Sequence, residues 1–208
     1  MAAMLIALAT VGAYLLGSVS FAILVSRLMR LPDPRSYGSK NPGATNVLRT
    51  GKKVAAVLTL AGDALKGFVA VVLALMYLPE AAPYVGMAAF LGHVFPVYHR
   101  FQGGKGVATA AGVLFGFDAW LGLGTISTFA VIAAFFRYVS LASMVAAAFA
   151  IFFAWFLKLD AVTIGAVAAM AALLVWRHKD NIKRLIAGTE SKLGQKKTTP
   201  PDPSAASQ

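Results

Sequence analysis

Apolar residues gather in seven runs along this chain, separated by short segments rich in glycine, asparagine, lysine and arginine. The runs have helical length and lack the alternation, with a period of two, that marks the strands of a membrane barrel. Because backbone groups cannot be solvated in a bilayer, such runs predict membrane-spanning α-helices. They cover residues 4–25, 54–78, 84–98, 107–117, 121–136, 141–157 and 161–176.

The third and fourth runs fall short of the ~20 residues that a perpendicular span needs. Both flank the glycine-rich residues 102–106. We therefore expect these two helices to be re-entrant or sheltered inside the bundle, where irregular backbone is tolerated. The first run has no basic segment before it, which favours a retained helix over a cleaved leader.

Composition and charge support this class of protein. Hydrophobic residues make up 59% of the 208 residues and charged residues only 13%, far from the average of soluble domains. The net charge of +11 lies in segments that follow the first, third, fifth and seventh runs, which indicates membrane orientation rather than nucleic-acid binding. These segments are therefore predicted to be cytoplasmic, with the N-terminus outside and the C-terminus inside.

The chain is predicted to be one all-α polytopic membrane bundle. Residues 1–194 form its single domain, and residues 195–208, rich in Pro, Ser and Thr, are expected to be a disordered tail. The chain has no cysteine, which excludes disulfides, a thiolate nucleophile and Cys-based metal sites.

The first candidate segment for chemistry is residues 38–49, where small residues let backbone amides approach an anion. Its neutral hydrogen-bond donors are Ser39, Asn41, Thr45 and Asn46. A short helix opening at Gly43 or Ala44 would attract phosphate, and Arg49 would add a bidentate contact. The alternative is an interfacial turn whose Lys40 and Arg49 only set topology, because Walker-type spacing is absent.

Two further segments carry similar chemistry. In residues 102–106, consecutive glycines free the backbone and Lys105 adds a point charge, unless the segment is only a flexible bend. Residues 176–185 are predicted to extend the last helix past the membrane, with His178 and Asn181 on one face. That face suits a hydroxyl or phosphate, and His178 suits proton transfer. The alternative is a solvated amphipathic helix attracted to anionic lipid.

Asp63 and Lys66 are a charged pair inside an apolar run, where ions are rare unless they are paired. We predict a structural ion pair, with indirect support of the site as the alternative. His93 is predicted to be an intramembrane hydrogen-bonding group. His93, Tyr98 and His99 lack carboxylate or cysteine partners at metal-ligand spacing, so no metal site is predicted.

Several motifs occur together in one order. They are Leu16-Gly17-Ser18, residues 38–49, Gly62-Asp63-x-x-Lys66-Gly67, Gly92-His93-x-x-Pro96, Phe101-x-Gly103-Gly104-Lys105-Gly106, and His178-x-x-Asn181-Ile182-x-Arg184-Leu185-x-x-Gly188-x-Glu190. This ordered set closely resembles the bacterial acyl-phosphate:glycerol-3-phosphate acyltransferase family, from the first run to Glu190. Lys40 departs from the resemblance, because a small residue is expected there.

The resemblance implies a seven-helix enzyme of the bacterial inner membrane with its active site facing the cytoplasm. Such an enzyme transfers a fatty acyl group from acyl phosphate to the 1-hydroxyl of glycerol 3-phosphate, giving lysophosphatidate and phosphate. This is the first acylation of phospholipid synthesis. The resemblance assigns glycerol 3-phosphate to Ser39, Arg49, Lys105, His178 and Asn181. It assigns acyl phosphate to Asn41, Gly43, Thr45, Asn46, Gly103 and Gly104.

By the same resemblance, the partners are the two substrates and membrane lipid, with no cofactor, metal, nucleic acid or stable protein partner. No histidine is followed at the fifth position by aspartate, as an acyl-CoA mechanism based on a His–Asp pair would require. A transporter of phosphorylated metabolites is the main rival, although the polar residues concentrate on one side and a transporter needs both. A purely structural protein would leave the recurring Gly, Asn, Ser and Lys unexplained.

Overall fold

The computed structural model describes residues 1–194, in which all regular structure is helical. The predicted tail, residues 195–208, lies outside the described residues. The α-helices of the described part are α1 Ala2–Gly17, α2 Phe21–Leu28, α3 Ala44–Val47, α4 Lys53–Tyr77, α5 Ala82–Val94, α6 Val107–Phe117, α7 Ala119–Phe136, α8 Val139–Phe156, α9 Ala161–Arg177 and α10 Lys179–Ile186. The predicted all-α class is confirmed.

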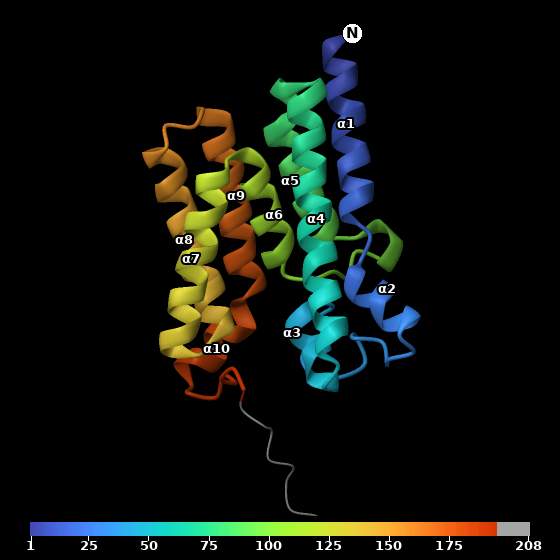
Figure 1. Cartoon of the computed structure of the whole chain (residues 1–208), viewed down its shortest axis with the longest axis vertical. Coiled ribbons are helices and arrows are strands. Elements are labelled where there is room, and N and C mark those ends of the chain that lie inside the picture. Colours follow the sequence, from blue (N-terminus) through green and yellow to red (C-terminus); the bar gives the residue numbers. More distant parts are fainter. Residues whose placement is uncertain (195–208) are drawn as a thin grey trace, which may run out of the picture.

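The helices form an upright bundle in which α1, α4 and α5 pack on one side and α7, α8 and α9 on the other (Figure 1). The N-terminus and α10 lie at opposite ends of this bundle (Figure 1). Many large apolar side chains on the outside of the bundle are exposed, among them Phe135, Phe152 and Trp155. An apolar exterior of this kind suits a lipid environment.

The first apolar run is broken rather than continuous. Helices α1 and α2 meet at an angle of 42°, across residues 18–20. Ser20 begins α2 by accepting a hydrogen bond from the Ile23 amide, and Ser18 Oγ donates to the Tyr14 carbonyl of α1. The break leaves the Val19 carbonyl free of the helix, where Lys66 Nζ donates to it at 2.6 Å.

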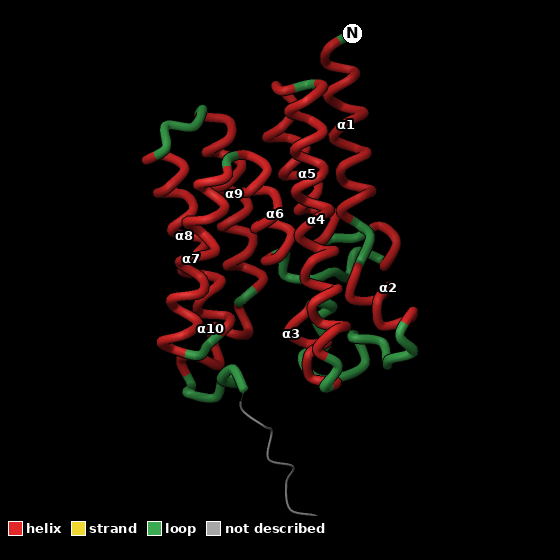
Figure 2. Tube along the Cα trace, viewed as in Figure 1, coloured by secondary structure: helices red, strands yellow, loops and turns green. Residues whose placement is uncertain are grey.

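The two short apolar runs form two short helices, as expected. Helix α5 has 13 residues and α6 has 11; α5 ends and α6 begins beside the middle of α4. At the end of α5, His93 meets Lys66, while a Cβ on Gly67 would lie 2.5 Å from the Thr109 carbonyl at the start of α6. Figure 2 shows that the loop joining α5 and α6 therefore crosses the bundle part-way along its length.

Helices α4 and α6 approach closely because glycine lines their contact. A Cβ on Gly112 would overlap the carbonyl oxygen of Ala64. Helices α1 and α5 use the same device, since Gly17 faces the Ala89 backbone and Gly92 faces that of Tyr14. Small residues let membrane helices pack by backbone contact, as predicted for the segment around Gly17.

The last helix differs from the prediction. Helix α9 stops at Arg177 and α10 leaves at an angle of 57°, so residues 176–185 are not one continuous helix. The ring Nδ1 of His178 lies 2.8 Å from the Leu174 carbonyl at this corner. Among residues 1–194, three helices are long and apolar enough to span a membrane by themselves, and there are up to five such spans if each bent pair counts as one.

Candidate functional site

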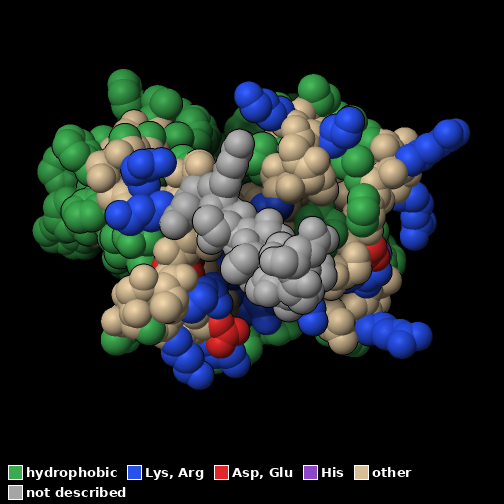
Figure 3. Space-filling view, turned by 90° about the horizontal axis from the view of Figure 1, so that it is seen from below, with side chains coloured by type: hydrophobic (Ala, Val, Ile, Leu, Met, Phe, Trp, Pro, Cys, Tyr) green, Lys and Arg blue, Asp and Glu red, His purple; other side chains and the backbone are tan. Residues whose placement is uncertain are grey.

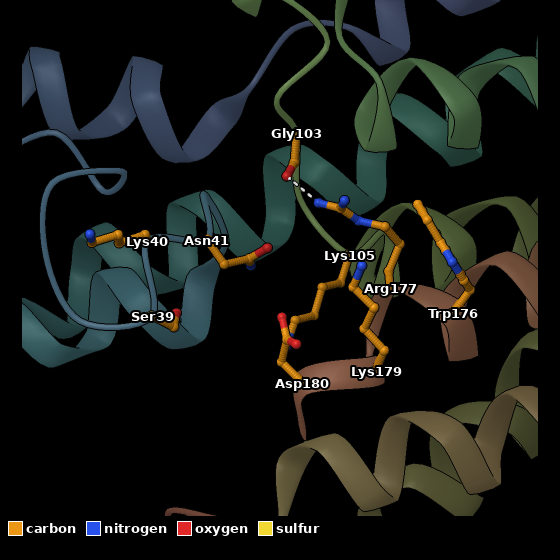
Figure 4. A pocket seen from close by; sticks show the side chains of 9 residues that line it. All are labelled: Ser39, Lys40, Asn41, Gly103, Lys105, Trp176, Arg177, Lys179 and Asp180. Carbon is orange, nitrogen blue, oxygen red and sulfur yellow. Dashed lines mark hydrogen bonds between the residues drawn. The ribbon is translucent and has the colours of Figure 1, made fainter. Parts of the chain in front are cut away.

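A pocket of about 180 Å³ lies where the loop before α3, the loop before α6 and the α9–α10 corner meet. Its lining residues are Ser39, Lys40, Asn41, Gly103, Lys105, Trp176, Arg177, Lys179 and Asp180. Figure 4 shows the Asn41 side chain reaching across the pocket toward Lys105 and Arg177, whereas that of Lys40 points away. The three segments singled out in the sequence thus converge on one cavity.

The glycine loop, residues 103–106, is held from two sides. The Gly104 amide donates to the His93 carbonyl at 3.1 Å, and a side chain on either Gly103 or Gly104 would collide with His93. On the other side, Arg177 donates through a terminal guanidinium nitrogen to the Gly103 carbonyl at 3.0 Å and through Nε to the Gly104 carbonyl at 3.3 Å. The Arg177 side chain also lines the pocket. Only Nε and one of its two terminal nitrogens donate to the loop.

Lys105 is the half-buried cation of this pocket. Its Nζ donates to Asn181 Oδ1, and Asn181 Nδ2 donates to Glu190 Oε1 at 2.6 Å. Burial lowers the pKa of Lys105 to about 8, against the attraction of Glu190, which raises it. The Lys105 amine is therefore protonated at neutral pH but poorly hydrated. In this state it attracts an anion strongly.

Glu190 ties α10 to the rest of the bundle. Its two oxygens accept from Ser140 Oγ of α8 at 2.7 Å, from Asn181, and from Arg184 Nε at 2.7 Å. These hydrogen bonds hold the pKa of Glu190 below its usual range, although burial opposes them. The carboxylate consequently fixes Asn181 and, through it, Lys105.

His178 sits at the corner between α9 and α10 and is 2% exposed. If Nδ1 carries the proton, it donates to the Leu174 carbonyl and leaves Nε2 as an acceptor. Burial, and then the charge of Lys105, lower the pKa of His178 to about 4. The imidazole is therefore neutral at physiological pH and is a weak base.

The loop before α3 is built around one buried amide. Asn46 Oδ1 accepts from the Ser39 amide at 3.0 Å, while Asn46 Nδ2 donates to the Pro34 carbonyl at 2.7 Å and the Tyr37 carbonyl at 3.2 Å. As expected, α3 opens directly after Gly43. The side chain of Asn46 is thus engaged in shaping the loop that presents Ser39.

The residues assigned by resemblance fall into two groups. Ser39, Asn41, Gly103 and Lys105 line the pocket directly. The others lie around it without lining it, and they are Gly43, Thr45, Asn46, Arg49, Gly104, His178 and Asn181. Arg49 is exposed and its guanidinium lies against Gly38, next to Ser39.

Arg177, which lines the pocket, and Glu190, which holds Asn181, are among the residues that the sequence did not indicate as candidates. In the sequence, Arg177 belongs to the basic segment after the seventh run, which indicates topology, and Glu190 is the last residue of a motif. A guanidinium directly after a run of apolar residues and next to a histidine is a weak signal. Its contact with the glycine loop spans 74 positions of sequence and depends on the fold.

The pocket is a strongly cationic place. Four of its lining residues, Lys40, Lys105, Arg177 and Lys179, are basic and only Asp180 is acidic. Figure 3 shows further Lys and Arg side chains over the same end of the molecule. Within residues 1–194, no group of three or more His, Cys, Asp and Glu side chains is placed to hold a metal ion. The arrangement suits phosphate groups.

A second cavity, of about 420 Å³, lies between the α4–α5 link and the start of α9. Its lining residues are Leu75, Pro79, Glu80, Ala82, Pro83, Tyr84, Phe117, Leu159, Asp160, Val162 and Thr163. No lysine or arginine is among them, and Asp160 caps α9 through the amides of Val162 and Thr163. This cavity therefore lacks the cations that phosphate binding needs.

Comparison with known proteins gives one consistent answer. A family model described as glycerol-3-phosphate acyltransferase matches residues 7–188. Glycerol-3-phosphate acyltransferases of Cupriavidus necator and Burkholderia pseudomallei are both 59% identical to this chain, over 203 and 201 residues. These alignments cover 95% and 94% of this chain and 99% of each relative.

Two crystal structures share the fold. They are of PlsY (YgiH), an integral membrane glycerol 3-phosphate acyltransferase, in its glycerol 3-phosphate and lysophosphatidic acid forms. The TM-scores are 0.87 and 0.86 at 36% and 35% identity, covering 91% of this chain and 96% and 95% of those chains. The chain is an integral membrane protein and belongs to the glycerol-3-phosphate acyltransferase family.

Proposed function

We propose that this protein transfers a fatty acyl group from acyl phosphate to the 1-hydroxyl of sn-glycerol 3-phosphate, giving lysophosphatidate and phosphate. The reaction is the first acylation of phospholipid synthesis. The single observation that supports it most is the cationic pocket in which Ser39, the glycine loop and the α9–α10 corner meet. Both substrates carry a phosphate, and the related crystal structures contain glycerol 3-phosphate and lysophosphatidic acid.

In this proposal the glycerol 3-phosphate phosphate is bound by Ser39, Arg49 and Lys105. His178 and Asn181 lie beside Lys105 and orient the glycerol hydroxyls. The acyl phosphate occupies the side of the pocket formed by the two backbone loops, with Asn41, Gly43, Thr45, Asn46, Gly103 and Gly104. Arg177 joins this set as a pocket-lining cation that also holds the glycine loop.

The chemistry requires positioning more than activation. Acyl phosphate is a mixed anhydride with a good leaving group, so the 1-hydroxyl oxygen attacks the carbonyl carbon and the bond from that carbon to the phosphate oxygen breaks. Phosphate leaves with the electron pair, and the hydroxyl proton passes to a base. Juxtaposing the two reactants contributes about 7–11 kcal/mol, and cationic donors stabilise the growing negative charge. No covalent acyl-enzyme is needed.

The base is either His178 or a phosphate oxygen of a bound substrate. The lowered pKa of His178, about 4, makes its ring a poor proton acceptor and favours the phosphate oxygen. We therefore expect His178→Ala to raise the Michaelis constant for glycerol 3-phosphate more than it lowers kcat. A collapse of kcat at an unchanged Michaelis constant would instead identify His178 as the base.

The proposal includes the orientation in the bacterial cytoplasmic membrane. The broken pair α1–α2 counts as one crossing element, and α4, α5, α6, α7, α8 and α9 count as one each, which gives seven. The first residue is then outside and α10 lies in the cytoplasm. The concentration of Lys and Arg at the α3 and α10 end supports this orientation. The pocket then opens toward the cytoplasm, where glycerol 3-phosphate is dissolved.

A direct assay tests the reaction. Purified protein is incubated with palmitoyl phosphate and glycerol 3-phosphate, and both lysophosphatidate and released phosphate are measured. Equimolar formation of the two products is expected. Uptake of glycerol 3-phosphate into sealed vesicles without lysophosphatidate formation would favour the transporter and contradict the proposal.

A further inference from the structure

Three ionisable side chains are buried together where α4, the end of α5 and the α1–α2 break meet. Lys66 Nζ lies 2.8 Å from Asp63 Oδ1, 2.6 Å from the Val19 carbonyl and 3.0 Å from His93 Nδ1. The side chains of Lys66, Asp63 and His93 are 1%, 3% and 6% exposed. The Nδ1 of His93 also lies 3.4 Å from Asp63 Oδ1. If Lys66 donates to this Nδ1, the ring proton of His93 is on Nε2.

Stability alone does not explain this cluster. Ionised groups are costly inside a membrane bundle, and neutral residues of similar volume often stabilise a fold as well as a buried ion pair does. The main apolar core of the bundle contains small residues that need no such pair, for example Ala70 and Ala89. The predicted pairing of Asp63 with Lys66 is confirmed, and the open question is what the pair supports.

His93 connects the cluster to the glycine loop. Its backbone carbonyl accepts from the Gly104 amide, and its ring fills the space where a side chain on Gly104 would lie, with Nε2 as the nearest atom. Arg177 holds the carbonyls of Gly103 and Gly104 from the opposite side. The loop is therefore clamped between Arg177 and the His93 ring, and Lys105 follows the clamp directly.

We propose that Asp63, Lys66 and His93 are positioning residues for acyl transfer. The Asp63–Lys66 pair fixes the tautomer and orientation of His93, and His93 in turn fixes the glycine loop that presents Lys105 and its neighbouring amides to phosphate. This inference rests on the acyltransferase activity proposed above. The three residues act through the loop, without contact to the substrates.

The first test removes both charges at once. D63N/K66M keeps the volume and leaves no unpaired charge in the core, whereas a single substitution would. We expect its thermal unfolding midpoint in detergent to stay close to wild type. Because a misplacement of ~1 Å can cost about 100-fold in rate, we expect kcat/KM with palmitoyl phosphate to fall by that order, mainly through kcat.

The matched control is Thr125→Val. Thr125 is also buried, but its hydroxyl donates only to the Leu121 carbonyl of its own helix, α7. This variant should keep wild-type rates. Wild-type kcat/KM in D63N/K66M would overturn the inference, whereas an inactive wild-type protein in the same assay would refute the acyltransferase proposal instead.

A second test does not depend on the charged pair. Gly104→Ala introduces a methyl group into the space of the His93 ring, and His93→Ala empties that space. Each single variant should lower kcat/KM. In the double variant G104A/H93A, the fold-decrease in kcat/KM should be smaller than the product of the two single fold-decreases. Losses that multiply would mean that ring and glycine act independently, which would overturn the inference even if D63N/K66M fails to fold.

Discussion

At the scale of single residues, burial determines the pH range in which Lys105 of the pocket carries its charge. Lys105 has a pKa of about 8 because burial disfavours its charged form. Below that pH the ammonium attracts phosphate in a partly desolvated site, and above it the neutral amine does not. Under the proposed function, the direction of this shift sets the alkaline limit of substrate binding.

We predict that kcat/KM for glycerol 3-phosphate falls as pH rises through about 8, because this ratio reports the free enzyme. Lys105→Arg should remove this decline, even if its plateau is lower, since a guanidinium keeps its proton far beyond pH 8. Initial rates measured from pH 6 to 10 check this. Lys53→Arg, an exposed change at the start of α4, is the control, and an unaltered decline in Lys105→Arg would contradict the prediction.

The glycines of the loop are a second prediction at this scale. A Cβ on Gly103 would lie 2.6 Å from the Val94 carbonyl and 2.5 Å from Pro96, so Gly103→Ala must displace the loop. We expect about a 100-fold lower kcat/KM. Gly165→Ala, where nothing lies within 4 Å, should leave the rate unchanged. Equal activity in the two variants would show that loop position is unimportant.

At the scale of helices, glycine contacts determine how closely the elements pack. Gly112 of α6 touches the Ala64 backbone of α4. Gly112→Ala should therefore destabilise the bundle by about 1–3 kcal/mol, through overpacking. The thermal unfolding midpoint in detergent measures this. Gly12→Ala on α1 meets nothing within 4 Å and should have little effect; an equal loss in both would refute backbone contact as the cause.

Helix positions were largely predictable, and helix breaks were not. The apolar runs located α4 and α6 within one residue at either end, because lipid requires continuous apolar helices. The break at residues 18–20 accompanies a hydrogen bond from Lys66, 47 positions away, to the Val19 carbonyl. The corner at His178 likewise accompanies the docking of α10 through Glu190. Such breaks depend on contacts that periodicity does not encode.

At the scale of the whole molecule, the absence of cysteine from the sequence makes orientation directly measurable. Single cysteines are introduced as Lys52→Cys and Glu80→Cys, at opposite ends of α4. A membrane-impermeant maleimide should label position 80 in intact spheroplasts and position 52 only in inside-out vesicles. The unmodified protein is the control for background labelling. Labelling of both positions from one side would contradict the proposed orientation.

Which segments meet at the site was predicted from shared chemistry, but which atoms line the pocket was not. The glycines, Lys105 and Ser39 stand out in sequence because their types suit phosphate. Asn46 looks like a ligand in sequence, yet in the fold its amide is engaged by Pro34, Tyr37 and Ser39. Arg177 looks like a topology signal, yet it holds the glycine loop. Roles of this kind follow from three-dimensional proximity alone.

Cysteine protection tests most directly whether this pocket receives phosphate substrates. Asn41→Cys and Lys179→Cys place thiols on opposite walls of the pocket, and Glu80→Cys places one in the second cavity. Maleimide labelling rates are compared with and without saturating glycerol 3-phosphate, in variants that retain activity. Slower labelling at positions 41 and 179, with no change at position 80, is the predicted result. Unchanged rates at both 41 and 179 would contradict it.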